Sequence, residues 1–520
     1  MTGDYQPTLA PNRVRWAIFF LGAATLVLTF SDPKPVLRLG DASEYLIMML
    51  SWFEDHTPYT GPEGAAVYDK FVHSHHVQVP FYTWQSLQTR FVHLNDGAIG
   101  QDYHHFWFYS LIAASVYGPM SWFDAPPTSA FPVMHLVLTS GAAWLIYRQL
   151  GLWGVLALLV LILISPAIWF IDKIHSEYFT VILGCVAVAY TMRRRFALAA
   201  FWFAVAATQN PPFTTIALVC LALELWRGHT QHALLWGILS VSISTIHPLY
   251  YYLRHGVYTP QWSGQGSTVN FETLIKPLYL SYVWIDPDVG LIANWPIVML
   301  CAVLVMILFL PRYRYSVARF GLGWDHVVLL AVAVATFSAA HAMTTNYHHG
   351  ATLSVSRYAT WYLPMLFPLF LIGLRLMDDV GCRRLPLYVM IISTIMCANI
   401  YVYWPGRLPR NHLPTPASAL LYAHWPGLYD PIPEIFEERL RHTEATRRKP
   451  QWAVSNPTGS KVLVYLDKLE QQPRPLKPVF GRPGLAADTV AVMAMAQRSN
   501  DRTYVYLNGM QDRIPVQAEY

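Results

Sequence analysis

Charged residues are scarce in this sequence of 520 residues, and their scarcity decides the broad class of protein. Asp, Glu, Lys and Arg together make up 13% of the chain, whereas a soluble protein carries roughly 25%. Hydrophobic residues make up 54% of it, and the mean hydropathy is +0.30. This composition excludes an ordinary soluble protein and predicts an integral membrane protein that crosses the bilayer many times.

Positive charge is also too sparse for a nucleic-acid-binding protein. The net charge is only +5, and no compact basic block is interleaved with aromatic residues. The five cysteines lack C-x-x-C spacing, so neither a disulfide framework nor a zinc site is predicted. The N-terminal apolar run lacks the small-residue site of a cleaved signal peptide, which makes it the first membrane helix.

Apolar stretches long enough to cross a bilayer predict a mainly α fold, a polytopic bundle of about 11 membrane helices. The predicted helices are 14–32, 129–147, 151–170, 179–192, 196–209, 211–226, 232–250, 291–310, 326–343, 359–376 and 386–404. Arginine gathers in alternate short loops, which places the N-terminus in the cytoplasm and the C-terminus outside. With an exported side free of cysteine, this pattern suits a bacterial inner membrane and a periplasmic C-terminus.

Two domains are predicted. Residues 1–404 form the membrane module, with exported loops at 33–127, 171–178, 251–290 and 344–358. The stretch 104–120 is predicted to lie at the outer leaflet, because a further span there would invert every later loop. Residues 405–520 begin with a proline-rich segment and continue with short alternating runs, which predicts a small exported α/β domain.

Two acidic motifs stand on the exported side at matched depth. "GDASEY" places Asp41 and Glu44 three positions apart, just after the first helix. That spacing is typical of a helix-capping box, and it also puts two carboxylates on one face for acid–base work. "IHSEYF" carries His175 and Glu177 at the outer end of the third helix. Because charges at membrane depth are costly, we expect the two motifs to meet at one site.

The order and sidedness of these motifs resemble the GT-C superfamily of glycosyltransferases, which includes protein mannosyltransferases and aminoarabinose transferases. "GDASEY", the interfacial "HHFWFYSLIAASVYGPM", "IHSEYF" and "VSRYATWYLP" follow one another along residues 1–405 as in that family. The resemblance implies an inverting transfer of sugar from a polyprenyl-phosphate donor to a glycan, lipid or protein acceptor. The chain lacks a WWD-type motif, so the subfamily stays open.

The resemblance also suggests roles for individual residues. Asp41, beside Glu44, is the candidate base for the acceptor hydroxyl, and Glu177 shares or orients that role while His175 positions the acceptor. Arg357 is the first candidate for the donor phosphate, because a guanidinium binds phosphate oxygens in bidentate fashion; an interfacial anchor is its alternative role. Arg254 and Lys276 are further candidates for the donor phosphate.

The sequence assigns no metal ligands and no cofactor. The "HSHH" run at 73–76 lacks an acidic residue at ligand spacing. A divalent cation held by the acidic residues stays open.

Two other functions stay open. A secondary transporter would fit the membrane charges and the helix break at "TQNPPF", although its loops are usually shorter. A non-catalytic membrane scaffold is the third alternative.

Overall fold

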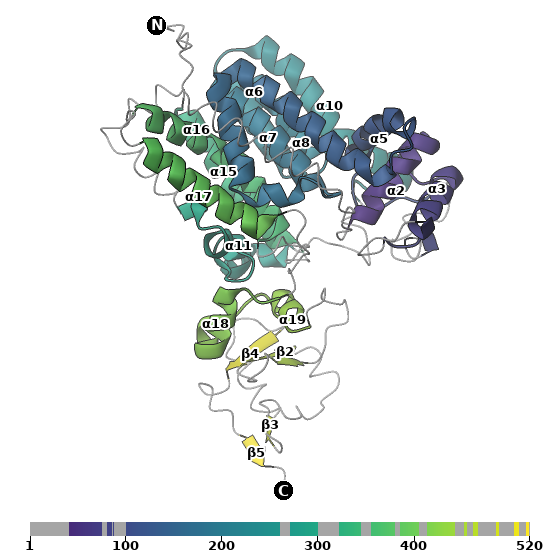
Figure 1. Cartoon of the computed structure of the whole chain (residues 1–520). Coiled ribbons are helices and arrows are strands. Elements are labelled where there is room, and N and C mark those ends of the chain that lie inside the picture. Colours follow the sequence, from purple (N-terminus) through teal and green to yellow (C-terminus); the bar gives the residue numbers. More distant parts are fainter. Residues whose placement is uncertain are drawn as a thin grey trace. The chain divides into compact units, whose positions relative to one another are not determined.

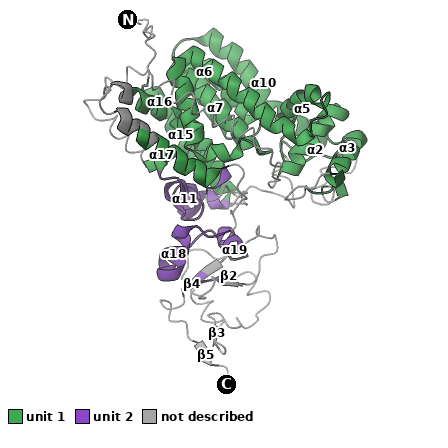
Figure 2. Cartoon of the chain, viewed as in Figure 1, with its two compact units in different colours: residues 1–271, 297–345, 358–408 green, residues 272–296, 346–357, 409–520 purple. Residues whose placement is uncertain are grey.

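The computed structural model describes most of the chain and divides it into two compact units (Figure 2). The described residues are 41–74, 81–85, 87, 100–259, 271–299, 322–344, 355–379, 385–404, 413–441 and five short strands. The predicted helix 14–32, most of the predicted helix 291–310 and the arginine-bearing loops at 312–319 and 383–384 lie outside these ranges. The described chain is mainly helical, as predicted (Figure 1).

Three helices of the first unit are long and apolar enough to cross a membrane. They are α6 (Ala130–Leu163, preceded by the 3-10 turn η1, Pro127–Ser129), α10 (Thr230–His255) and α15 (Trp324–Met343). The backbone of α6 leaves the helical region at Gly151, where φ is 68° and ψ is −164°. Glycine tolerates this positive φ, so α6 is two helices joined at a kink, close to the predicted break between 147 and 151.

Three further apolar helices of the first unit are shorter. They are α7 (Ser176–Met192), α8 (Phe196–Ala207) and α9 (Phe213–Trp226). At 1.5 Å per residue even the 17 residues of α7 span only about 26 Å, less than the ~30 Å of a bilayer's hydrocarbon core. The described residues therefore support three membrane-spanning helices, and the predicted number of about 11 is not confirmed.

The bundle is built around α7, every residue of which is buried. It packs against α6, α8 and α16 (Leu363–Asp379), which follows the 3-10 turn η7 (Arg357–Tyr362). At Gly184 a Cβ atom would lie 2.6 Å from Pro364 Cγ, so the missing side chain lets α7 and α16 approach closely. Asn399 of α17 (Leu385–Tyr403) donates to the carbonyls of Leu163 and Ser165, which closes the C-terminal end of α6 beside η2 (Pro166–Phe170).

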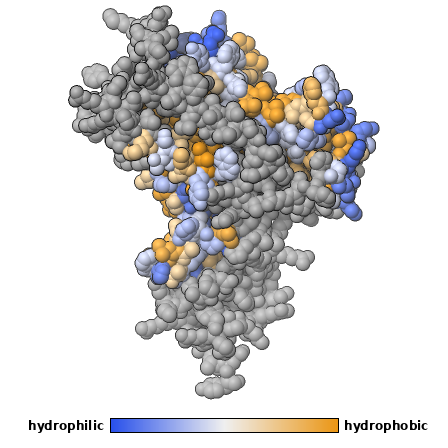
Figure 3. All heavy atoms as spheres, viewed as in Figure 1, coloured by the Kyte–Doolittle hydropathy of each residue, from blue (hydrophilic) through white to orange (hydrophobic). Residues whose placement is uncertain are grey.

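The described residues of the first predicted exported loop contribute three helices to this unit. They are α2 (Ala42–Glu54), α3 (Pro62–Ser74) and α5 (Phe108–Ser121), and α2 packs against the other two. The stretch 104–120 is thus helical over most of its length, and its position at the outer leaflet stays a prediction. Hydrophilic residues gather over α3, whereas hydrophobic ones reach the surface elsewhere on this unit (Figure 3).

The second unit comprises residues 272–296, 346–357 and 409–520. Its helical elements are η5 (Glu272–Ile275), α11 (Pro277–Ile285), α12 (Leu291–Asn294), α18 (Pro416–His424), η9 (Pro426–Leu428) and α19 (Pro433–Arg441). Strands β1 (Trp452–Val454), β2 (Lys461–Tyr465) and β4 (Tyr504–Asn508) form one antiparallel sheet; β3 (Leu485–Ala487) pairs with β5 (Val516–Ala518). That the tail forms a separate exported α/β domain stays a prediction.

Two buried aspartates tie the parts of the second unit together. Asp288 accepts hydrogen bonds from the Thr415 amide at 2.9 Å and the Ser418 hydroxyl at 2.5 Å. Asp286 accepts from the Tyr429 hydroxyl at 3.0 Å. The turn "DPDVG", in the predicted loop 251–290, therefore holds the first helices of the tail, and this unit crosses the predicted domain boundary at 404.

Candidate functional site

The two acidic motifs lie together in the first unit, as expected. Asp41 stands at the N-cap of α2, and Glu44 lies in the first turn of that helix. His175 stands at the N-cap of α7 without a side-chain capping hydrogen bond, and Glu177 lies in the first turn of that helix. His175 Nε2 is 3.6 Å from Asp41 Oδ2, while its Nδ1 pairs with Glu177. Two helix starts that are distant in sequence therefore present their side chains to each other.

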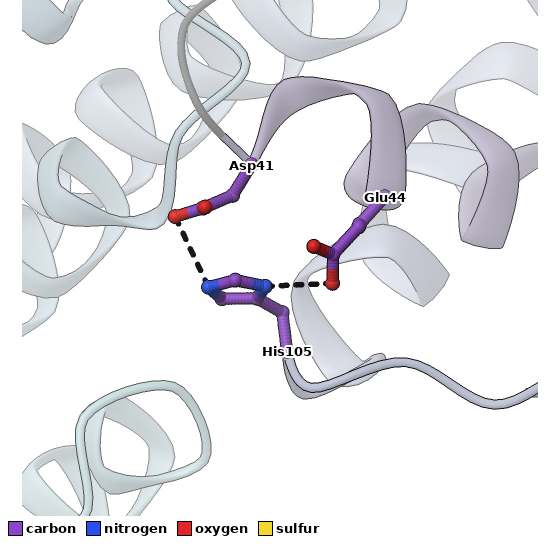
Figure 4. Close-up of side chains that lie close together, drawn as sticks. All are labelled: Asp41, Glu44 and His105. Atoms are coloured by element: carbon purple, nitrogen blue, oxygen red, sulfur yellow. Dashed lines mark hydrogen bonds and ion pairs between the residues drawn. The ribbon is translucent and has the colours of Figure 1, made fainter. Parts of the chain in front are cut away.

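A third segment completes this cluster with His105. Its Nε2 lies 3.0 Å from Asp41 Oδ2 and its Nδ1 lies 2.8 Å from Glu44 Oε2 (Figure 4). The result is a row of alternating carboxylates and imidazoles: Glu44, His105, Asp41, His175 and Glu177. The sequence did not single out His105, because nothing local separates it from the other histidines of the loop 33–127.

The side chain of Asp41 does not act as the cap of a capping box. Asp41 makes no side-chain capping hydrogen bond to α2. Its carboxylate is instead directed to the imidazole of His105 (Figure 4). The D-x-x-E spacing therefore places two carboxylates on either side of one histidine.

Exposure changes along the row. The side chains of Glu44, His175 and Glu177 are 8%, 4% and 3% exposed. Those of Asp41 and His105 are 20% and 21% exposed. The central carboxylate and its first histidine can thus meet a ligand, whereas the outer glutamates serve as buried partners of the two imidazoles.

Tyr45 holds the two histidines at a fixed spacing. Its ring centre lies 5.3 Å from that of His105 and 6.1 Å from that of His175. Its hydroxyl lies 3.2 Å from Ser176 Oγ on α7, and Ser110 donates to its carbonyl at 2.9 Å. Since Tyr45 is 3% exposed, this support is rigid and connects α2, α5 and α7.

The charges of the row favour a protonated His105. Burial alone would lower the pKa of His105, but the charges and hydrogen bonds of Asp41 and Glu44 outweigh it and raise that pKa to about 10. Burial raises the pKa of Glu44, and the neighbouring imidazolium opposes this rise. An imidazolium between two carboxylates is the arrangement that these contacts stabilise near neutral pH.

The same residues have the composition of a metal site. Asp41, Glu44 and His105 each offer a ligand atom, all within 4.8 Å of one another. An ion between Asp41 and His105 Nε2 would leave Glu44 as the acceptor for the other ring nitrogen, a common second-shell arrangement. In "HSHH", His73 is exposed and lies 3.6 Å from Asp69, while His75 and His76 lie outside the described residues.

Arg254, predicted to bind the donor phosphate, pairs with a carboxylate of the protein. Helix α10 continues to His255, five residues past its predicted end, so Arg254 lies on that helix. Its guanidinium pairs with Asp102, which also lies 2.6 Å from His255 Nε2 and 2.6 Å from the Tyr250 hydroxyl. Asp102 therefore fastens the segment before His105 to the end of α10.

The other two predicted phosphate ligands belong to the second unit. Arg357 is 9% exposed, and the amide of its neighbour Ser356 donates to the Val289 carbonyl at 3.0 Å. Lys276 stands at the N-cap of α11, with its ammonium 5.7 Å from the centre of the Tyr279 ring. Phosphate binding by Arg357 or Lys276 stays a prediction.

Comparison with known proteins does not assign the chain to a family. No family model, no curated protein and no solved structure matches this chain. Its function is therefore argued from the geometry of the row around Asp41.

Proposed function

We propose that the chain is a membrane glycosyltransferase that moves a sugar from a polyprenyl-phosphate donor to an acceptor hydroxyl. The observation that carries this proposal is the partly exposed centre of the row: a carboxylate, Asp41, that contacts two imidazoles, each of them paired with a buried glutamate. The order of motifs along the chain, and the apolar helices that a prenyl tail requires, support the same function.

The chemistry is an inverting single displacement. The acceptor oxygen attacks the anomeric carbon as its proton passes to Asp41, and the bond from that carbon to the phosphate oxygen breaks. The electron pair of that bond leaves with the prenyl phosphate. A cationic His105 keeps the Asp41 carboxylate ionised and ready to accept the proton.

The remaining residues of the row position the acceptor. His175 lies near the same carboxylate oxygen of Asp41 that His105 contacts, and it is held by Glu177. An acceptor hydroxyl that donates to Asp41 would lie within reach of this imidazole. Arg357 and Lys276 are proposed to neutralise the leaving phosphate, for which a guanidinium is well shaped. The proposal places this chemistry on the exported face of a bacterial inner membrane.

A proton-coupled transporter is the second candidate, and the same row favours it. Alternating carboxylates and imidazoles near membrane helices also carry protons in pumps and transporters. A transporter would need the row to change its protonation during each cycle. A glycosyltransferase needs only that Asp41 accept one proton for each sugar transferred.

Mass analysis of the cell envelope separates these functions. Cells that lack the protein should lose one sugar-bearing glycan, lipid or protein and accumulate the corresponding prenyl-phosphate sugar. An unchanged set of envelope glycans, together with loss of uptake or efflux of a solute, would favour the transporter and contradict the transferase.

A further inference from the structure

Gln209 carries a buried amide that has no hydrogen-bond partner in the part of the chain that the structure describes. The residue is 7% exposed, and in the described part of the chain neither Oε1 nor Nε2 of its side chain forms a hydrogen bond. A buried amide left in this state lowers the stability of the fold. Such groups are rare in native proteins, and each calls for an explanation such as a ligand that satisfies it.

Gln209 lies close to the start of α7. It belongs to the turn between α8 and α9, the "TQNPPF" break of the sequence. The next residue, Asn210, donates its Nδ2 to Thr180 Oγ1 at 2.6 Å. Thr180 in turn donates to the Ser176 carbonyl at 3.0 Å. This turn is therefore fastened to the first turn of the helix that carries Glu177.

Two more buried polar atoms that have no hydrogen-bond partner among the described residues lie on neighbouring elements. They are Nε2 of His341, on α15, and Nε1 of Trp361, in η7. His341 is 0% exposed and Trp361 is 5% exposed. The two ring centres are 5.0 Å apart, so these atoms belong to one neighbourhood.

Helices α9 and α15 are antiparallel, which fixes the end of the bundle at which these groups stand. Arg227, after the last residue of α9, lies 3.3 Å from Asp325 in the first turn of α15. At the other end the rings of Phe213 and Phe337 are 4.8 Å apart. Residues before Phe213 and residues after Phe337 therefore lie at the same end.

Gln209 and His341 both lie at that end. Gln209 precedes Phe213 by one turn, and His341 follows Phe337 by one turn. Trp361 lies at this end too, because the centre of its ring is 5.9 Å from the centre of the Phe337 ring. The structure thus gathers an amide, an imidazole and an indole with unused hydrogen-bonding atoms at the end of the bundle where α7 begins.

We propose that Gln209, His341 and Trp361 bind the hydroxyl groups of the transferred sugar. This assignment rests on the proposed glycosyltransferase function and names the residues that recognise the donor. Neighbouring sugar hydroxyls both donate and accept, which the amide of Gln209 can match with both of its ends. The indole adds an N–H donor, and the imidazole adds a donor or an acceptor.

The test measures the binding of two probes by the purified full chain. One probe is farnesyl phosphate, and the other is a set of farnesyl-phosphate-linked mannose, glucose and galactose. In Gln209→Leu and Trp361→Phe, the dissociation constant of the sugar-bearing probe that the native protein binds should rise about tenfold. Farnesyl phosphate without sugar should bind as before.

Thermal unfolding without ligand supplies a second readout. Gln209→Leu should melt at or above the temperature of the native protein, because it removes an unsatisfied buried amide. Asn399→Leu is the matched control, since the Asn399 amide is bonded to Leu163 and Ser165. The control should melt lower while its affinity for the sugar-bearing probe stays the same.

Three outcomes would overturn the assignment. Unchanged binding of the sugar-bearing probe by Gln209→Leu would reduce the unpartnered amide to a defect of packing and leave the proposed function standing. Equal weakening for both probes would mean that the effect is not on the sugar. Failure of the native protein to bind any sugar-bearing probe would overturn the proposed function and this assignment together.

Discussion

At the scale of single residues, the contacts of His105 make the stability of the fold depend on pH. It joins Asp41 and Glu44, and their charges raise its pKa from 6.5 to about 10. A pKa that is higher in the folded chain means that the protonated imidazole stabilises the fold. This contribution is complete below about pH 6.5 and is lost as the pH rises through about 10.

The corresponding variant is His105→Gln. The melting temperature of the native protein should exceed that of the variant by most at pH 6, and the difference should shrink as the pH approaches 10. Melting curves of both proteins at pH 6, 8 and 10 would measure this. A difference that stays constant, or grows with pH, would contradict a protonated His105 between two carboxylates.

The sequence predicts the site residues that differ clearly from their neighbours in the chain. It misses those whose role depends on a contact with a distant residue. Asp41 and Glu177 stood out because acidic residues are rare in this chain and both lie next to apolar runs. His105 left no such signal, because its role depends on a contact across 61 positions to Glu44. The sequence gives no sign that Arg254 pairs with Asp102, because the two lie 152 positions apart and only folding brings them together; phosphate binding by Arg254 stays a prediction.

At the scale of elements, Asp102 fastens the first exported segment to the end of α10. Its carboxylate is met by Arg254, by His255 at 2.6 Å and by the Tyr250 hydroxyl at 2.6 Å. Asp102→Asn replaces one acceptor oxygen with an amide that faces donors. We expect a loss of about 3 kcal/mol in unfolding free energy, the size seen when a buried pair loses one partner.

The matched control for this variant is Asp69→Asn, which removes a carboxylate from an exposed pair with His73. Exposed pairs contribute little, so this change should stay within about 0.5 kcal/mol. Denaturant unfolding of both variants measures the difference. Similar small effects for the two would mean that Asp102 does not fasten α10 to the loop.

Element boundaries show why sequence patterns stop short of the fold. The kink of α6 at Gly151 lies at the gap in the apolar pattern beside Arg148, with a helical segment on each side of it; the second segment ends at Leu163, before the predicted end at 170. The end of α10 could not be predicted from the apolar pattern, because Tyr251, Arg254 and His255 are polar enough to suggest a loop. Tyr251 is nevertheless buried, and its hydroxyl donates to the Tyr103 carbonyl at 3.0 Å. A tertiary contact therefore extends this helix.

At the scale of the whole molecule, the second unit depends on a buried pair of carboxyl groups. Burial, with the nearby charge of Asp288, raises the pKa of Asp286 from 3.8 to about 7. Because this pKa is higher in the folded chain, the contribution of Asp286 to stability is complete below about pH 4 and is lost as the pH rises through 7.

Asp286→Asn keeps an oxygen that accepts hydrogen bonds and removes the charge. Amide hydrogen exchange in α18 should be slower in this variant than in the native protein at pH 8. At pH 4, where Asp286 is protonated, the two proteins should exchange alike. Faster exchange in the variant at pH 8 would show that the ionised carboxylate is what holds the helix.

The predicted orientation of the chain is also a property of the whole molecule. Alternation of the arginine-bearing loops places the C-terminus outside the cytoplasm. A reporter that is active only in the cytoplasm, fused after Tyr520, should therefore stay inactive. An active reporter would mean that the number of membrane crossings is even rather than odd.

The most direct test of the account is the rate of sugar transfer by Asp41→Asn beside that of Glu44→Gln. Asn keeps the size of Asp41 but cannot take a proton, and a positioned base contributes about 10²–10⁴ in rate. Transfer by purified Asp41→Asn from the prenyl-phosphate sugar should fall by roughly that factor, in protein that is still expressed and folded. Glu44→Gln still accepts from His105, so it should lose far less. Native transfer rates in a folded Asp41→Asn protein would contradict the assignment of Asp41 as the base.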